Sequence, residues 1–223
     1  SVMNRSFPCE IDDSKSKNNT FINLSECDEQ SISDEWLAGK FKNKGYMING
    51  LVFHYDVRPI YNGKEGLLND VLDDLENIDD KYFLNKSQRE LNKKLKGAKK
   101  IERITKSGFK YWWCEGQMAQ YDDPFKPGRT MLTSEGTMNR SSHIIQVGSN
   151  KCRFLTPEEA ERLNGFKTGW TKNMPERARY FCMGNALVVD IVAKLGASIL
   201  KLFNSRYQLI LTPSKIDIHK EVD

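Results

Sequence analysis

Two blocks in the last third of the chain decide its fold: RFLTPEEAERLNGF occupies residues 153–166, and YFCMGNALVV occupies residues 180–189. The first block carries the signals of a helix start. Thr156 can cap the helix, Pro157 suits its first position, and Glu159 completes a capping box with Thr156. Two ordered blocks at a fixed separation are far more specific than one short motif.

The same blocks predict where the helices end and begin again. The first helix should run to about Asn164 and stop at Gly165. Gly184 and Asn185 precede a longer apolar helix over roughly residues 185–203. Its apolar side chains recur at helical spacing and form one stripe: Val188, Val192, Leu195, Ile199 and Leu202.

The composition is that of a polar globular protein. The chain has 223 residues, of which 39% are hydrophobic and 29% are charged. It has neither a run of 18 apolar residues nor an apolar signal region near its first residue, so the sequence predicts a cytoplasmic protein without a membrane span. The five cysteines show no metal-ligand spacing, which predicts free thiols and no metal site.

Charge is concentrated in one segment, which we call the basic block, residues 86–110. It holds ten Lys or Arg against two Glu, a net of +8, whereas the whole chain carries +4. Just before it, residues 65–80 hold seven acids and no base. A basic segment in a nearly neutral protein is typical of a phosphate-binding surface, although a solvated lysine-rich loop would have the same composition.

Periodicity and turn residues outline the rest of the chain. Residues 10–35 are polar with little periodicity, which predicts a loop or linker. Asn49-Gly50 between two β-like runs predicts a hairpin. The remaining segments predict two short helices, over residues 67–75 and 87–96, and three strands, over residues 109–113, 129–133 and 143–147.

The two blocks resemble the last two conserved motifs of the DNA cytosine-5 methyltransferases. Arg-x-Leu-Thr-Pro-x-Glu at residues 153–159 resembles the motif that supports the target-recognition domain, and Gly-Asn-Ala-Leu-Val-Val at residues 184–189 resembles the final motif. Two departures are Lys167, where the family normally has Pro, and Ala160, where Cys is frequent. The resemblance spans roughly residues 40–203.

This family's reaction needs groups that the resemblance assigns to the first half of the enzyme. A thiolate must add to cytosine C6, an acid must assist at the ring nitrogen, and the base must leave the DNA stack. No Phe-x-Gly-x-Gly cofactor loop occurs in this chain. We interpret Phe7-Pro8-Cys9 and Glu76-Asn77-Ile78 as coincidental matches to the catalytic motifs, because Glu10 follows the cysteine and the second match ends an acidic helix. No catalytic residue is therefore expected.

The resemblance implies two sets of binding residues. A helix that begins at the second block would direct amide groups toward the carboxylate end of S-adenosylmethionine, with Asn185, Ala186 and Leu187 in contact. The expected DNA-binding residues are Lys93, Lys94, Lys99, Lys100, Arg129, Thr133 and Arg140. Trp112, Trp113 and Tyr121 are candidates for packing or base contact, and alternation along a strand suggests that one of the two tryptophans is in the core.

The sequence thus predicts an α+β fold, with a small irregular β-rich target-recognition domain and C-terminal helices that pack on a missing Rossmann-like catalytic domain. The expected parts are a linker or catalytic-domain edge at 1–40, the recognition domain at 41–150, the helices at 151–205 and a tail at 206–223. The apolar stripe should be covered by the catalytic half or by another copy of the chain, or else be exposed.

The expected function is that of the DNA-recognition and cofactor-completing part of a restriction-modification DNA cytosine-5 methyltransferase. Its partners would be duplex DNA and an N-terminal catalytic half or subunit, and alone it would be inactive. Two alternatives stay open: a stand-alone DNA-binding module or decayed remnant without activity, and an active enzyme that uses Cys9.

Overall fold

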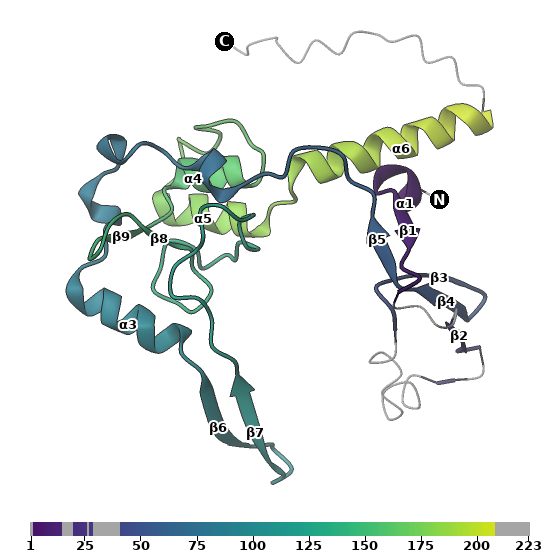
Figure 1. Ribbon diagram of the computed structural model, residues 1–223, viewed down its shortest axis with the longest axis horizontal. Helices are drawn as coiled ribbons and strands as arrows, with labels where there is room; N and C mark the ends of the chain where they lie inside the picture. The colour runs from purple at the N-terminus through teal and green to yellow at the C-terminus, as the bar shows by residue number, and fades with distance from the viewer. Residues whose placement is uncertain (1, 15–19, 26, 29–40, 208–223) are drawn as a thin grey trace. The chain divides into compact units, whose positions relative to one another are not determined.

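The computed structural model describes residues 2–14, 20–25, 27–28 and 41–207, and mixes helices with short strands (Figure 1). It forms two compact units. Unit 1 comprises Ser1–Gly63 and Ala193–Asp223, and unit 2 comprises Lys64–Val192. Unit 2 holds residues 64–150 of the predicted recognition domain together with the two blocks at residues 153–166 and 180–189, which we call the closing motifs; residues 41–63 lie in unit 1.

Unit 1 contains a short helix and two small antiparallel sheets. Its elements are α1 (Val2–Ser6), β1 (Cys9–Ile11), β2 (Thr20–Asn23), β3 (Lys44–Ile48), β4 (Leu51–Tyr55) and β5 (Val57–Pro59), together with most of α6 (Val189–Tyr207). Strand β1 pairs with β5, and the second sheet has the order β2-β4-β3. The predicted loop over residues 10–35 is therefore wrong where β1 and β2 form; residues 15–19, 26 and 29–40 lie outside the described residues.

The predicted hairpin at Asn49-Gly50 is confirmed. Both residues have positive φ, 49° and 78°, and they connect β3 to β4. Two successive left-handed residues match the right-handed twist of a hairpin, which is why Asn and Gly are favoured there.

Unit 2 carries the remaining elements. They are η2 (Leu68–Val71), η3 (Leu75–Asn77), η4 (Asp80–Tyr82), α3 (Lys86–Lys96), β6 (Lys99–Ile104), β7 (Lys110–Glu115), β8 (Ile144–Gln146), β9 (Cys152–Phe154), α4 (Pro157–Leu163), α5 (Glu176–Asn185) and the start of α6. Strands β6 and β7 form one antiparallel pair, and β8 and β9 form another. Three predictions are confirmed: the helix over 87–96 and the strands over 109–113 and 143–147.

Two other predictions are wrong for a tertiary reason. Residues 67–75 form short 3₁₀ turns instead of one helix, because side chains of α4 bind the backbone between the turns: Glu159 accepts from Asp73 N at 2.8 Å, and Arg162 donates to Val71 O at 3.0 Å. Residues 129–133 form no strand; Arg129 is instead drawn into contacts with its own domain, described below.

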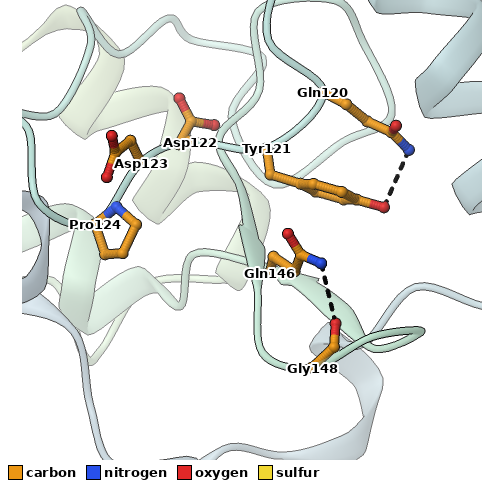
Figure 2. A pocket seen from close by; sticks show the side chains of 7 residues that line it. All are labelled: Gln120, Tyr121, Asp122, Asp123, Pro124, Gln146 and Gly148. Atoms are coloured by element: carbon orange, nitrogen blue, oxygen red, sulfur yellow. Dashed lines mark hydrogen bonds between the residues drawn. The ribbon is translucent and has the colours of Figure 1, made fainter.

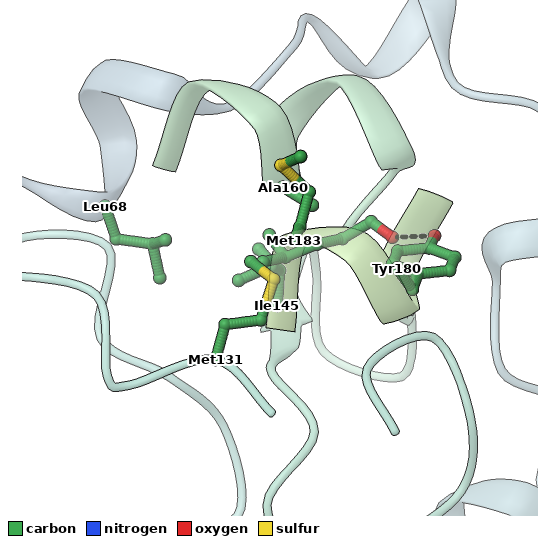
Figure 3. Packing of buried hydrophobic residues seen from close by; sticks show 7 residues of the cluster. Leu68, Met131, Ile145, Ala160, Tyr180 and Met183 are labelled. Atoms are coloured by element: carbon green, nitrogen blue, oxygen red, sulfur yellow. Dashed lines mark hydrogen bonds between the residues drawn. The ribbon is translucent and has the colours of Figure 1, made fainter. Parts of the chain in front are cut away.

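The apolar core lies in unit 2, where the β8–β9 pair packs with α4, α5 and η2 (Figure 3). Tyr180 closes this core, and its hydroxyl donates to Leu155 O at 2.6 Å. Among the described residues, every buried hydrophobic side chain belongs to unit 2. The main cluster consists of Leu68, Met131, Ile145, Leu155, Ala160, Tyr180 and Met183.

The helix start predicted at Thr156 is confirmed with its capping box, and Gly165 follows the helix with a φ of 80°. The single apolar helix predicted over 185–203 begins later than expected. Gly184 and Asn185 end α5, residues 186–188 form no helix, with Ala186 in an extended conformation, and α6 begins at Val189. No helix in the described ranges is both long and apolar enough to cross a membrane.

Candidate functional site

The first closing motif is built around a buried ion pair. Arg153 on β9 donates two hydrogen bonds of 2.7 Å to the two carboxylate oxygens of Glu159 on α4, and both side chains are almost fully buried. The same carboxylate accepts from Thr156 N at 2.8 Å and from Asp73 N. Every acceptor site of Glu159 is thus directed at a specific donor, so the motif joins β9, α4 and η2 into one rigid unit.

Glu161, in the next turn, organises the loop between α4 and α5. Its carboxylate accepts from the amides of Gly169, Trp170 and Thr171, from the Thr171 hydroxyl and from Arg179. Burial by itself would raise the pKa of Glu161, but these hydrogen bonds outweigh burial and hold the pKa below its usual value of 4.5. The carboxylate therefore stays ionised and shapes the loop.

The two closing motifs are fastened to each other by Asn164. Its side-chain amide donates to Met183 O at 3.2 Å, and its backbone carbonyl accepts from Val189 N at 3.0 Å. These bonds hold the end of α5 and the start of α6. They explain why the expected continuous helix is interrupted at residues 186–188.

Gly184 is required by a close approach and not by a turn. A Cβ atom at this position would overlap the backbone of Leu132 and Thr133, and no positive φ occurs there. The residue lets α5 lie directly against the segment that follows Arg129.

Of the residues predicted to contact a cofactor, Asn185 ends α5, and Ala186 and Leu187 lie in the short connection between α5 and α6. Asn185 bonds its side-chain amide to Phe181 O at 3.0 Å, while Leu187 is 73% exposed. The amide groups of Leu187 and Val188 have no acceptor among the described residues. These two amides lie just before the first residue of the 19-residue helix α6, and free amides at such a position are a suitable environment for a carboxylate.

The lysines of the basic block differ in whether a neighbouring side chain already contacts their ammonium group. Lys93 and Lys94 are exposed on α3 and have no ion pair within the described part of the chain. Lys99 pairs with Glu115 at 3.4 Å, and the Lys100 amine lies 4.8 Å from the centre of the Trp112 ring.

Arg129 is bonded inside unit 2. It donates to both oxygens of the Asp122 carboxylate and to the carbonyls of Ser141 and Ser142. Nearby, Lys96 is buried with its amine 3.7 Å from Asp122, and burial lowers the pKa of Lys96. The arginine thus braces a buried charge cluster, while 33% of its side chain stays exposed.

Arg140 is also an internal brace. Its guanidinium donates to Leu95 O and Gly97 O at 2.8 Å and to Gly116 O, and lies 3.5 Å from the Glu115 carboxylate. A guanidinium with these acceptors has few donors left for phosphate. Sequence reasoning missed this role because the acceptors are mostly backbone carbonyls, which leave no signal in the sequence.

Other expected contact residues are more accessible. Thr133 is exposed, although its backbone lies against Gly184. Trp112 is 59% exposed and Trp113 is half-buried, so neither tryptophan lies in the core as expected for one of them. Tyr121 is half-buried and lines an open hollow.

That hollow has a volume of about 540 Å³ beside β8 (Figure 2). Its polar side chains are largely engaged: the Gln120 amide donates to the Tyr121 hydroxyl at 3.0 Å, and the Gln146 amide donates to Gly148 O at 3.2 Å. The Asp122 carboxylate is occupied by Arg129. The other carboxylate of the lining, Asp123, accepts from Phe125 N at 3.0 Å and lies 3.4 Å from the Lys126 amine.

Comparison with known proteins matches this arrangement of motifs. The model of the C-5 cytosine-specific DNA methylase family matches residues 18–201. The type II methyltransferase M.Sau3AI of Staphylococcus aureus is 43% identical over 192 residues, which are 86% of this chain and 45% of the relative. The chain thus spans less than half the length of this relative.

Two solved structures are similar at low identity. The S. pombe Dnmt2 methyltransferase shows 15% identity and a TM-score of 0.47, over 69% of this chain and 51% of that chain. The Entamoeba histolytica methyltransferase EhMeth shows 16% identity and a TM-score of 0.41, over 92% of this chain and 56% of that chain. The family match over most of the chain and the identity to the Staphylococcus aureus relative show that this protein belongs to the C-5 cytosine-specific DNA methylases.

Proposed function

We propose that this chain is the DNA-recognition and cofactor-completing part of a DNA cytosine-5 methyltransferase of restriction-modification type. The observation that carries the proposal is the apolar surface beside the final motif. Leu187, Ile191 and Val192 are exposed next to the turn that closes unit 2. Apolar side chains gathered beside a binding turn are typical of an interface, and the occupant that fits is the catalytic half of the enzyme.

Unit 1 supports the same proposal. Its described residues include no buried hydrophobic side chain. On its sheet the Phe53 ring stacks on Tyr46, with 5.1 Å between centroids, and lies 5.6 Å from the tilted ring of Phe21; Tyr46 and Phe21 are exposed. A sheet without a core of its own needs a further layer to bury its apolar face. A catalytic domain that packs on the apolar face of this sheet would supply that layer.

S-adenosylmethionine would then be shared between the two halves. The turn at Asn185, Ala186 and Leu187 would hold the carboxylate end of the cofactor through amide groups at the start of α6. The cofactor supplies the methyl group that reaches C5 of cytosine. The catalytic thiolate, the acid and the main cofactor pocket would come from the other half.

Duplex DNA would bind through the basic block and through exposed groups beside it. Lys93, Lys94 and Lys100 are the strongest candidates for phosphate contacts, because their charges are accessible. Lys99 would contribute less, since Glu115 already neutralises it. Thr133 remains a candidate for a hydrogen bond to the backbone of the DNA.

The test is complementation. Methyl transfer from labelled S-adenosylmethionine to duplex DNA is measured with this chain alone, with the part of the Staphylococcus aureus relative outside the matched region, and with the mixture. We expect activity only in the mixture. Leu187→Asp should abolish the activity of the mixture without unfolding the chain, whereas Leu132→Asp, another exposed leucine, should leave it intact.

Other outcomes separate the alternatives. Activity of this chain alone that disappears in Cys9→Ser would identify an independent enzyme and overturn the proposal. DNA binding without any activity in the mixture would favour a stand-alone DNA-binding module or a decayed remnant. If Leu132→Asp loses as much activity in the mixture as Leu187→Asp, the exposed turn at Leu187 is not a specific interface.

A further inference from the structure

Two nucleophilic side chains of unit 1 lie in direct contact. The amine of Lys44 donates a hydrogen bond to the sulfur of Cys9, with 2.7 Å between Nζ and Sγ. The two residues are 35 positions apart in the sequence, so the fold of unit 1 brings them together. Both residues are partly exposed, which leaves the pair accessible to a small molecule.

The backbone on the cysteine side of the contact is well held. Cys9 is the first residue of β1, which pairs with β5 (Figure 1). Before the strand, Pro8 O accepts from Ile60 N at 2.9 Å. After the strand, Asp12 N donates to Asp56 O at 2.8 Å. The sulfur is therefore carried by a short strand that is fastened at both ends.

The neighbour of Lys44 fastens the lysine side to the same pair of strands. Lys44 is the first residue of β3. The side-chain amide of Asn43 accepts from Val57 N at 2.8 Å and donates to Val57 O at 2.9 Å. Because this amide bonds both backbone groups of one residue on β5, it fixes the start of β3 beside the β1–β5 pair. The amine thus reaches the sulfur from a defined direction.

The pair opens into a second hollow, which has a volume of about 590 Å³ and includes Cys9 and Lys44 in its lining. A volume of several hundred Å³ is typical of a small-molecule site. Such a hollow suits a short apolar group that is attached to a reactive carbonyl carbon. Most of the other lining side chains are apolar or aromatic: Met3, Ile11, Tyr46, Tyr55 and Val57.

A sulfur and an amine at this distance favour the transfer of an acyl group from one to the other. A thiolate is a strong nucleophile toward a thioester carbonyl, whereas the amide of an amine is the more stable product. An acyl carbon bound to Cys9 would lie beside the Lys44 nitrogen, within the roughly 3–3.5 Å that a reactive geometry requires. Groups held in this way react as if each were present at a very high concentration.

We propose that Cys9 and Lys44 form a self-acylation site, at which Cys9 accepts an acyl group from a small acyl thioester and passes it to Lys44. First, the Cys9 thiolate attacks the thioester carbonyl carbon. A carbon–sulfur bond to Cys9 forms, the bond to the donor's sulfur breaks, and the departing thiolate takes up the proton that Cys9 released.

In the second step the neutral Lys44 amine attacks the same carbonyl carbon. A carbon–nitrogen bond forms, the bond to Cys9 breaks, and the Cys9 sulfur takes up the proton that the nitrogen loses. The two steps need no oxidant or reductant, and Cys9 returns to its starting state. The product is an amide at Lys44, which has lost its positive charge and places an apolar group in the hollow.

The experiment incubates the full chain with acetyl-coenzyme A at mildly alkaline pH and follows each lysine by peptide mass spectrometry. We expect Lys44 to be acetylated at least about a hundredfold faster than Lys93 and Lys94, which are exposed on α3. This inference does not depend on the proposed function, because the assay contains neither DNA nor S-adenosylmethionine.

Three variants separate the two steps. Cys9→Ser replaces the thiol by a weaker nucleophile, so Lys44 should be acetylated only as fast as Lys93. Lys44→Arg cannot accept the acyl group, so the acetyl group should stay on Cys9 as a thioester that neutral hydroxylamine removes. Cys114→Ser, at the exposed cysteine of β7, is the matched control and should leave the rate at Lys44 unchanged. Circular dichroism confirms that each variant is folded.

The unaltered chain already tests the proposal, since acetylation of Lys44 at the rate of Lys93 would overturn it. An undiminished rate at Lys44 in Cys9→Ser would show that the sulfur takes no part. If Lys44→Arg acquires no hydroxylamine-sensitive acetyl group, the first step does not occur. If the acetyl group stays on Cys9 in the unaltered chain, the transfer to Lys44 does not occur.

Discussion

The guanidinium of Arg153 and the carboxylate of Glu159 face each other inside unit 2 through two hydrogen bonds of 2.7 Å, with both side chains excluded from solvent. Removing one member of such a pair leaves the other as an uncompensated buried charge. The closing motif therefore depends on both residues together, and the helix cap at Thr156 depends on the same carboxylate.

Glu159→Gln is expected to lower the free energy of unfolding of the full chain by about 3 kcal/mol, because it leaves Arg153 charged and buried. Urea denaturation followed by circular dichroism measures the change. Glu158→Gln is the matched control: Glu158 is more exposed, and its ion pair among the described residues is with Arg179, so its loss should cost less than about 1 kcal/mol. If both variants lose the same free energy of unfolding, the buried pair of Glu159 with Arg153 contributes no more than the more exposed pair of Glu158 with Arg179.

Gly184→Ala should destabilise unit 2 strongly, because the added methyl group would overlap the backbone of Leu132 and Thr133. Forced overlap in a packed interior costs roughly 1–3 kcal/mol. Gly196→Ala on α6 serves as the control, since no atom lies within 4 Å of its added methyl group. That substitution should be neutral or stabilising by about 0.5–1 kcal/mol through helix propensity. Thermal unfolding measures the Tm of both variants. An unchanged Tm for Gly184→Ala would contradict the close approach of α5 to the backbone of Leu132 and Thr133.

Acid should destabilise the loop between α4 and α5 through Glu161. Because the folded pKa of Glu161 lies below its usual value of 4.5, its contribution to stability is fully present above about pH 4.5 and is lost as the pH falls through the folded pKa. Glu161→Gln should therefore be less stable than the unaltered chain at pH 7 and should lose less stability between pH 5 and pH 3. Denaturation series at these pH values measure the slopes. Parallel slopes would contradict a depressed pKa at this carboxylate.

Neutralising Lys93, Lys94 and Lys100 together should weaken DNA binding and reduce its dependence on salt. Each phosphate contact that is lost should lower the slope of log K against log salt by about 0.9. Fluorescence anisotropy at several salt concentrations measures this slope. Lys167→Ala, an exposed lysine outside the basic block, should leave the slope unchanged. If the triple variant shows the same slope as the unaltered chain, these three lysines of the basic block do not contact the phosphates of the DNA.

Local signals in the sequence predicted the parts of the fold that local interactions determine. The capping box at Thr156 and the hairpin at Asn49-Gly50 involve residues two or three positions apart, and the structure contains both. The helix over residues 67–75 failed because Glu159, far along the chain, captures the amide of Asp73. No local pattern could have indicated this contact.

The same distinction between local signals and distant contacts applies to the predicted DNA-binding residues. Charge density marked the exposed lysines of α3, which the structure leaves accessible. The family resemblance marked Arg129 and Arg140 as well, whose acceptors include a carboxylate seven residues away and carbonyls more than twenty residues away. A basic residue looks alike in the sequence whether it faces solvent or braces a loop, and only tertiary structure separates the two.

The brace at Arg140 also has a consequence for how this part of the chain can vary. Two of its acceptors, Gly97 O and Gly116 O, are backbone groups at the two ends of the β6–β7 strand pair, which any residue would offer. The residues between these carbonyls could therefore change while the contacts that hold both ends stay the same. Grafting residues 98–115 from a relative should exchange the strand pair without disturbing the rest of unit 2.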